Sequence, residues 1–262
     1  MMYHFIAHTD PGLARHNNED SVAFDEDAAL VVLADGMGGY NAGEIASGMA
    51  SAFIKSELGR WLIEAGPGAK LNEVQRAMGI CVANANLAIF NSANSNPQSA
   101  GMGTTLVMGV FRGDQLLVGH IGDSRCYRFR AGQFDQITKD HSLLQEQIDA
   151  GLITPEEAST SSIKNLVTRA LGVEEVVELE INSHRVEAGD LYLLCSDGLS
   201  DMLDDGTIAK IIANHTELGA LAAALIHAAN ENGGRDNISV ILAQAQGVTE
   251  KRGLIARWLG KS

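Results

Sequence analysis

Basic residues are scarce in this chain. Its 262 residues include 19 lysines and arginines against 33 aspartates and glutamates, for a formal net charge of −14. Nucleic acids are bound through clustered basic side chains, so this composition argues against a nucleic-acid partner. Clustered acidic metal ligands would account for part of the excess.

Cysteine, leader sequences and long apolar runs are also missing or few. The three cysteines, Cys81, Cys126 and Cys195, form no pairing or zinc pattern, so we expect reduced core residues. No basic-then-apolar leader and no run of membrane-spanning length occurs, which predicts a cytoplasmic protein. No Gly-Lys-Ser/Thr follows the glycines, which excludes a P-loop.

The stretch from Leu30 to Gly39 organises the rest of the chain. Five apolar residues, Leu30 to Ala34, predict a strand that is buried on both faces. Asp35 follows at once, and then three glycines within four positions. A carboxylate at the end of such a strand needs an offsetting charge, and glycines let the backbone turn and leave room for an ion.

The same arrangement recurs three times along the chain. Asp123 follows the apolar run 116–122, Asp197 follows 191–196, and Asp236 precedes 238–243. Four such aspartates predict one shared acidic cluster, where mutual repulsion favours bound cations. Because no Cys or His pair has metal-ligand spacing, a hard ion such as Mg²⁺ or Mn²⁺ is expected.

Hydrophobic spacing predicts alternating groups of strands and helix pairs. The expected strands are 3–9, 21–24, 30–34, 104–111, 115–121, 125–130, 134–137, 178–185, 190–196 and 238–244, and the expected helices are 42–65, 71–90, 142–150, 205–215 and 216–232. The first helix shows helical spacing of its large apolar residues, which are Ile45, Met49, Phe53, Leu58, Trp61 and Leu62. This order favours an α/β four-layer sandwich: two mainly antiparallel sheets face to face, flanked by antiparallel helix pairs.

Two segments stand apart from this core. Residues 139–172 are polar and predict a mobile insertion, or flap, over one edge of the site within a domain of residues 1–246. Residues 247–262 form a basic amphipathic tail with Lys251, Arg252 and Trp258. Docking of the tail on its own domain is favoured over contact with a partner or a membrane.

A set of motifs in fixed order now points to a family. It comprises Thr9-Asp10-Pro11-Gly12, Arg15 with Asn18-Glu19-Asp20-Ser21, Ala34-Asp35-Gly36-Met37-Gly38-Gly39, Gly103-Thr104-Thr105, Gly122-Asp123-Ser124-Arg125, Asp140-His141-Ser142, Thr168-Arg169-Ala170-Leu171-Gly172, Ser196-Asp197-Gly198-Leu199-Ser200-Asp201 and Gly234-Arg235-Asp236-Asn237. Across residues 9 to 237 the chain resembles the metal-dependent serine/threonine protein phosphatases of the 2C type (PPM family), in their bacterial form.

The resemblance implies a role for each matching residue. Asp35 would bridge two ions, with the Gly36 carbonyl on one of them, and Asp197 and Asp236 would complete the first site. Glu19 and Asp20 would serve the second site, directly or through water. Asp123 with Asp197 would hold a third ion near the insertion. Arg15 would clamp the substrate phosphate, so that Arg15 and Asp35 are the expected catalytic residues.

The implied activity is hydrolysis of phosphoserine and phosphothreonine in proteins, reversing a cognate Ser/Thr kinase. Two or three Mn²⁺ or Mg²⁺ ions would hold a bridging water for direct attack on phosphorus. We expect a monomer that acts on phosphorylated proteins, with a small regulatory protein of a partner-switching circuit as a narrower substrate. The alternative is a non-catalytic phosphoprotein-binding module of the same fold, but such modules usually lose metal ligands.

The sequence departs from the family at two places. Met37 stands where eukaryotic relatives have a histidine that protonates the leaving group, which leaves metal-bound water as the expected donor. Residues 159–164 replace a His-Pro-containing run found before the Asn-x-x-x-Arg segment, here Asn165 and Arg169. His141 is expected to order the base of the insertion, and His120 to be a strand histidine with a satisfied ring.

Overall fold

Two antiparallel β-sheets form the centre of the computed structural model, which describes residues 1–39, 42–95, 97–154, 157–158 and 166–247. One sheet has the order β1 (Met2–Asp10), β11 (Ile238–Gln246), β10 (Leu191–Cys195), β7 (Arg125–Arg130) and β8 (Gln133–Gln136). The other has the order β2 (Asp20–Asp25), β3 (Leu30–Met37), β5 (Leu106–Arg112), β6 (Gln115–Ile121) and β9 (Glu180–Arg185), with the short β4 (Gly103–Thr104) paired to β3.

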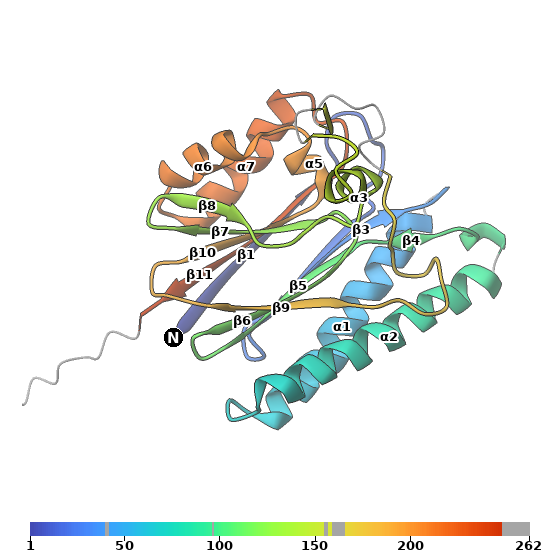
Figure 1. Cartoon of the computed structure of the whole chain (residues 1–262), viewed down its shortest axis with the longest axis horizontal. Coiled ribbons are helices and arrows are strands. Elements are labelled where there is room, and N and C mark those ends of the chain that lie inside the picture. Colours follow the sequence, from blue (N-terminus) through green and yellow to red (C-terminus); the bar gives the residue numbers. More distant parts are fainter. Residues whose placement is uncertain (40–41, 96, 155–156, 159–165, 248–262) are drawn as a thin grey trace, which may run out of the picture.

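Helices cover the outer face of each sheet (Figure 1). The helices α1 (Ala42–Ala65) and α2 (Leu71–Ser95) pack on the sheet that contains β3, whereas α6 (Asp205–Ala213) and α7 (Leu218–Glu231) pack on the sheet that contains β11. A third apolar cluster fills the space between the sheets. The predicted four-layer sandwich is confirmed, and helix boundaries such as 42–65 agree with the spacing of the sequence.

Strand β3 shows why a continuous apolar run belongs here. Leu30, Val32 and Ala34 join the core under α1 and α2, while Val31 and Leu33 join the core between the sheets. Alternate side chains of a strand point to opposite faces, so both faces of β3 need apolar residues.

The expected stripe of α1 is confirmed except at its first position, since Leu58 and Leu62 are buried and Met49, Phe53 and Trp61 pack against the core. Ile45 is 47% exposed, whereas the buried stripe consists of Ala46, Ala50, Ile54, Leu58 and Leu62. Small alanines let the helix approach the sheet closely, and this packing outweighs the greater hydrophobicity of Ile45. In α2 the predicted stripe of Val74, Met78, Cys81, Ala85 and Ile89 is buried.

Smaller differences from the expected elements concern where helices begin and end. Helix α2 extends to Ser95, five residues past the predicted end, and a short helix α5 (Asp197–Ser200) follows β10. The helix α3 (Leu143–Asp149) begins after Ser142, whose side chain accepts a hydrogen bond from Gln145 N. The three cysteines are buried and unpaired, as expected.

The remaining expectations for the insertion and the tail fall partly outside the described residues. Those concerning residues 159–165 and 248–262 cannot be compared with the fold, because these residues are not among those described. Within the described part of the chain, no helix has the length and apolar character needed to span a membrane.

The strand register brings distant polar segments to one end of the sandwich. Asp20 pairs with Asp35 at the end of β2 and β3, and Asp10 pairs with Ile238 at the end of β1 and β11. At the same end, Cys195 pairs with Arg125 beside the turn that carries Asp123. The helix α5 begins one residue after Ser196, so it starts beside these strand ends.

Candidate active site

Five aspartates lie close enough at this end to perturb one another's ionisation. Burial raises the pKa of Asp35 well above its ordinary value, and the charges of four more aspartates raise it further: Asp20, Asp197, Asp123 and Asp236. Burial likewise raises the pKa of Asp197, and the charges of Asp123 and Asp236 add to the effect. The four aspartates expected from the strand ends therefore lie together, and Asp20, which the family resemblance had named, lies with them.

Asp20 and Asp123 are the most buried of these carboxylates, each 9% exposed. Burial raises the pKa of each to about 6. Ser196 Oγ donates a hydrogen bond to Asp20 Oδ2 at 2.8 Å, but Asp20 Oδ1 is buried and has no hydrogen-bond partner among the described residues. A buried carboxylate oxygen without a donor is unfavourable unless a cation approaches it.

Two glycines allow the backbone segments of the site to approach closely. A Cβ atom at Gly36 would overlap the carbonyl oxygens of Gly43 and Glu19. A Cβ atom at Gly198 would overlap the Asn237 carbonyl oxygen, so glycine is needed for Asp197 to lie beside Asp236. The room that the glycines provide is thus filled by neighbouring backbone, which fixes the spacing of the acidic side chains.

Asn237 joins the N-terminal loop to the last strand. Its Oδ1 accepts a hydrogen bond from Glu19 N at 2.7 Å, and its Nδ2 donates to the carbonyls of Pro11 (3.0 Å) and Asn17 (2.9 Å). Asp236 Oδ1 in turn accepts from Asn237 N at 2.8 Å. Sequence reasoning gave Asn237 no role, although its place between Asp236 and the strand is a usable signal for a side chain that ties loops together.

Thr105 likewise joins two segments of the site, on the side of Asp35 and Asp123. Its N–H donates to the Asp35 carbonyl at 2.9 Å, and its Oγ1 accepts from Asp35 N at 3.1 Å. The same hydroxyl lies 2.7 Å from Ser124 Oγ, next to Asp123. Thr105 therefore links the backbone of Asp35 to the turn that carries Asp123.

Arg15 lies at the exposed rim of the cluster. Its Nη2 donates to Asp236 Oδ2 at 2.7 Å, and the two side chains are 52% and 31% exposed. The hydrogen bond that Arg15 donates to Asp236 raises the pKa of Arg15, and the negative charges of Glu19 and Asp197 raise it further. An ion pair this exposed adds little stability, so the guanidinium can exchange Asp236 for another anion at low cost.

Met37 ends β3 opposite Gly103. A thioether has no titratable proton, so position 37 cannot supply the acid that a histidine would.

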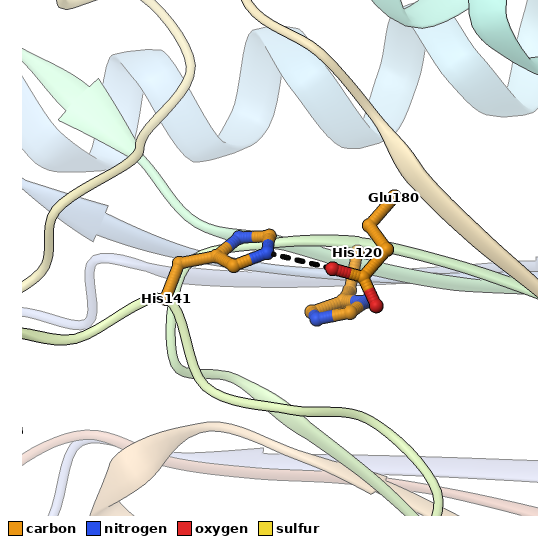
Figure 2. Close-up of side chains that lie close together, drawn as sticks. All are labelled: His120, His141 and Glu180. Carbon is orange, nitrogen blue, oxygen red and sulfur yellow. Dashed lines mark hydrogen bonds and ion pairs between the residues drawn. The ribbon is translucent and has the colours of Figure 1, made fainter. Parts of the chain in front are cut away.

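His120, His141 and Glu180 form a separate group whose potential ligand atoms lie within 4.8 Å of one another (Figure 2). His120 Nε2 lies 2.7 Å from the Lys139 carbonyl, but its Nδ1 is buried without a hydrogen-bond partner among the described residues. The expectation that its ring is fully satisfied is therefore wrong. The backbone of His141 donates to the Gly122 carbonyl and accepts from Thr168 N, so His141 orders the base of the insertion as expected.

The donor set of the aspartate cluster fits a hard divalent cation. All its side-chain donors are carboxylate oxygens, their pKa values are raised by burial and mutual repulsion, and one oxygen is left without a donor. Each of the predicted residues Arg15, Glu19, Asp20, Asp35, Gly36, Asp123, Asp197 and Asp236 lies at or beside the cluster. The metal-ligand roles of the acidic residues and the Gly36 carbonyl, and the phosphate-binding role of Arg15, stay predictions.

Comparison with known proteins agrees with this geometry. A protein-family model described as Protein phosphatase 2C matches residues 14–242. The serine/threonine protein phosphatase PstP of Mycobacterium tuberculosis (strain ATCC 25618 / H37Rv) is 42% identical over 93% of this chain. The chain covers 45% of PstP, so it spans less than half the length of that relative.

Two further comparisons cover nearly all of both chains. The serine/threonine phosphatase stp of Listeria innocua serovar 6a is 36% identical over 90% of this chain and 93% of that protein. A crystal structure of the catalytic domain of PstP in complex with two manganese ions has a TM-score of 0.82 and 40% identity, and the match covers 94% of this chain and 99% of that one.

Proposed function

The chain belongs to the protein phosphatase 2C family, and from this membership we propose that it hydrolyses phosphoserine and phosphothreonine in proteins, reversing a cognate Ser/Thr kinase. The observation that carries the proposal is the cluster of five aspartates with an exposed arginine at its rim. The phosphatase domain is assigned to residues 1–246, with residues 139–172 as its flap and residues 247–262 as a tail.

We assign the acidic residues to two or three bound Mn²⁺ or Mg²⁺ ions, as the manganese complex of PstP supports. Asp35 would be shared by two ions, with the Gly36 carbonyl on one of them, and Asp197 and Asp236 would complete the first site. Glu19 and Asp20 would serve the second site, directly or through water, and Asp123 with Asp197 would hold the third ion. When bound, such ions supply Lewis acidity that polarises a phosphate ester and lowers the pKa of a water molecule.

Arg15 is assigned to the substrate. A planar guanidinium matches two oxygens of a phosphate monoester, and exchange of Asp236 for the phosphate frees the Asp236 carboxylate for ligation. Because Met37 has no proton to give, the leaving alkoxide takes its proton from water.

The test is manganese-stimulated hydrolysis of a phosphothreonine peptide. Asp35→Asn and Asp197→Asn should abolish it. Asp135→Asn is the control, because Asp135 lies on the edge strand β8 and pairs with Arg128 of β7, outside the cluster. Retained hydrolysis in both cluster variants would contradict the assignment.

The alternative of a non-catalytic phosphoprotein-binding module finds less support. All the expected acidic residues are present, and the relatives are named as phosphatases. Calorimetric titration with Mn²⁺ separates the enzyme from the binding module, since a module that has lost its metal ligands would bind no Mn²⁺.

A further inference from the structure

His141 lies outside the aspartate cluster, yet it holds both polar groups of one backbone residue beside it. Its N–H donates to the Gly122 carbonyl at 2.9 Å, and its ring Nδ1 accepts from Gly122 N–H at 3.2 Å. Gly122 directly precedes Asp123. The position of the Asp123 backbone therefore depends on His141, a residue from the start of the insertion.

Gly122 has little freedom of its own in this structure. Its φ is +99°, a conformation that residues with a side chain rarely adopt, and a Cβ atom would lie 2.8 Å from Thr105 Cβ. Thr105 in turn holds the backbone of Asp35. Gly122 is thus held between His141 on one side and the residue that positions Asp35 on the other.

The hydrogen bonds assign one tautomer to His141. Because Nδ1 accepts from Gly122 N–H, the ring proton is on Nε2, and Nε2 donates to Glu180 Oε2 at 3.2 Å (Figure 2). Asn182 Nδ2 donates to the other oxygen of Glu180 at 3.0 Å. The carboxylate on β9 therefore orients the ring that holds Gly122.

This group is poorly arranged for a metal ion despite its composition. The rings of His120 and His141 are stacked, with centroids 4.6 Å apart and planes 14° from parallel. Imidazole lone pairs lie in the ring plane, so two stacked rings do not aim their nitrogens at one ion. Moreover, the outward nitrogen of His141 carries the proton and is already bonded to Glu180. The geometry favours a mechanical role.

The backbone of the same residue closes the insertion. The His141 carbonyl accepts from Thr168 N at 2.8 Å, Ser142 pairs with Val167, and Leu143 N donates to the Leu166 carbonyl at 2.9 Å. His141 therefore contacts the far end of the insertion through its carbonyl and Gly122 through its ring and N–H. It is the point where the insertion and the Asp123 turn are joined.

We propose that His141 is a positioning residue that fixes Asp123 for its ion and couples the insertion to that ion. The inference rests on the proposed function, because it takes Asp123 as a ligand. The inference predicts that loss of the acceptor at His141 Nδ1 weakens the Mn²⁺ binding that depends on Asp123. The Mn²⁺ binding that depends on Asp35 should stay unchanged. Partners of metal ligands typically contribute about 10- to 100-fold to affinity.

Two variants of the full chain separate the two functions of the ring. His141→Asn keeps an acceptor at the position of Nδ1 but loses the contact with Glu180, whereas His141→Gln keeps a donor toward Glu180 but loses the acceptor for Gly122. Calorimetry with Mn²⁺ identifies the Asp123-dependent binding event as the one that is lost in Asp123→Asn. The Mn²⁺ affinity of this event should be roughly 10-fold or more weaker in His141→Gln. In His141→Asn it should stay near the wild-type value.

Equal Mn²⁺ affinity of His141→Gln and the wild type would overturn the inference, as would Zn²⁺ binding to the wild type that is lost in Glu180→Ala. Failure of the proposed function is a separate result, because it is shown by hydrolysis of the phosphothreonine peptide that is retained in Asp35→Asn and Asp197→Asn. Should His141→Gln fail to fold, nitrogen-15 NMR of the wild type still decides: a proton on His141 Nε2 supports the inference, and a proton on Nδ1 excludes the Gly122 bond.

Discussion

Asp20 and Asp35 lie directly opposite each other on the paired strands β2 and β3. Like charges in this arrangement repel across a sheet, and here both carboxylates are also removed from water, since burial raises the pKa of each. The fold therefore maintains an unfavourable pair of like charges at one end of the sandwich. A cation between the strands would reverse the sign of that contribution, which suggests that stability and metal binding are linked.

The first prediction is that Asp35→Asn stabilises the metal-free protein. Removal of one charge relieves repulsion from four neighbouring aspartates, so the melting temperature in EDTA should rise by about 2–4 °C, corresponding to roughly 1 kcal/mol. The same variant should lose the rise in melting temperature that Mn²⁺ gives the wild type. Differential scanning calorimetry with and without Mn²⁺ measures both, and a less stable variant in EDTA would contradict the prediction.

The second prediction concerns pH. Burial raises the pKa of Asp20 and Asp123 to about 6 in the folded chain, against about 3.9 when unfolded. Between these values the folded state retains protons that the unfolded state has lost, so in EDTA the free energy of unfolding should fall as pH rises from about 4 to about 6. Urea titrations across this range should show a smaller fall in the free energy of unfolding for Asp20→Asn than for the wild type. An equal fall in the two proteins would show that the raised pKa of Asp20 is not its cause.

The third prediction compares Gly36, near the end of β3, with Gly39, which follows the strand. Gly36→Ala places a methyl group against the carbonyl oxygens of Gly43 and Glu19, whereas a Cβ atom at Gly39 has nothing within 4 Å. Gly36→Ala should therefore lower the melting temperature and abolish Mn²⁺ binding, while Gly39→Ala should leave both near their wild-type values. Calorimetry of the two variants measures both quantities. Equal melting temperatures and equal Mn²⁺ affinities of the two variants would contradict the prediction.

Sequence patterning was sufficient for the layers and for the gathering of acids. Apolar runs such as 30–34 predict strands buried on both faces, and an acid next to each such run must lie at a strand end. Asp35, Asp123, Asp197 and Asp236 were found in this way. Asp20 was named only through the family resemblance, because its strand is short and its place opposite Asp35 depends on strand pairing that the residue pattern does not state.

The features that sequence did not reveal depend on contacts between distant segments. Ala46 and Ala50 form the buried stripe of α1 because of close packing on the sheet, while hydrophobicity favoured Ile45. The bonds of Asn237 to Pro11 and of His141 to Gly122 join side chains to remote backbone groups. Such bonds leave no periodic trace in a sequence, so only the folded chain shows them.

The fourth prediction tests the ion pair of Asp190 and Arg130 at the other end of the five-stranded sheet. Arg130 Nε and Nη2 donate to the two oxygens of Asp190 at 2.7 and 2.6 Å, and Asp190 is 1% exposed. Burial would raise the pKa of Asp190, but the hydrogen bonds from Arg130 and the Glu187 N–H lower it overall. Its stabilising effect is therefore present above about pH 4 and lost as pH falls through the lower folded value.

Asp190→Ala should accordingly cost about 3 kcal/mol at pH 7, because it leaves the Arg130 guanidinium without its partner. Asp114→Ala is the control, since this carboxylate is 60% exposed and lies 3.9 Å from Arg185. The control should stay within about 0.5 kcal/mol of the wild type. Urea unfolding at pH 7 measures both, and similar losses would show that the buried pair has no special role.

The fifth prediction concerns Arg15, whose partner in the metal-free chain is a proposed ligand. Arg15→Ala removes the donor for phosphate and frees Asp236, so hydrolysis of a phosphothreonine peptide should fall roughly 100-fold in kcat/KM while Mn²⁺ affinity stays the same or increases. Arg60→Ala is the control, because Arg60 forms a solvent-exposed ion pair with Glu57 on α1, outside the cluster. Stability should change little in either variant, since both pairs lie in solvent. Steady-state kinetics combined with Mn²⁺ calorimetry decides the point, because a loss of Mn²⁺ binding in Arg15→Ala would mean that the arginine orders the ligands instead of holding the substrate.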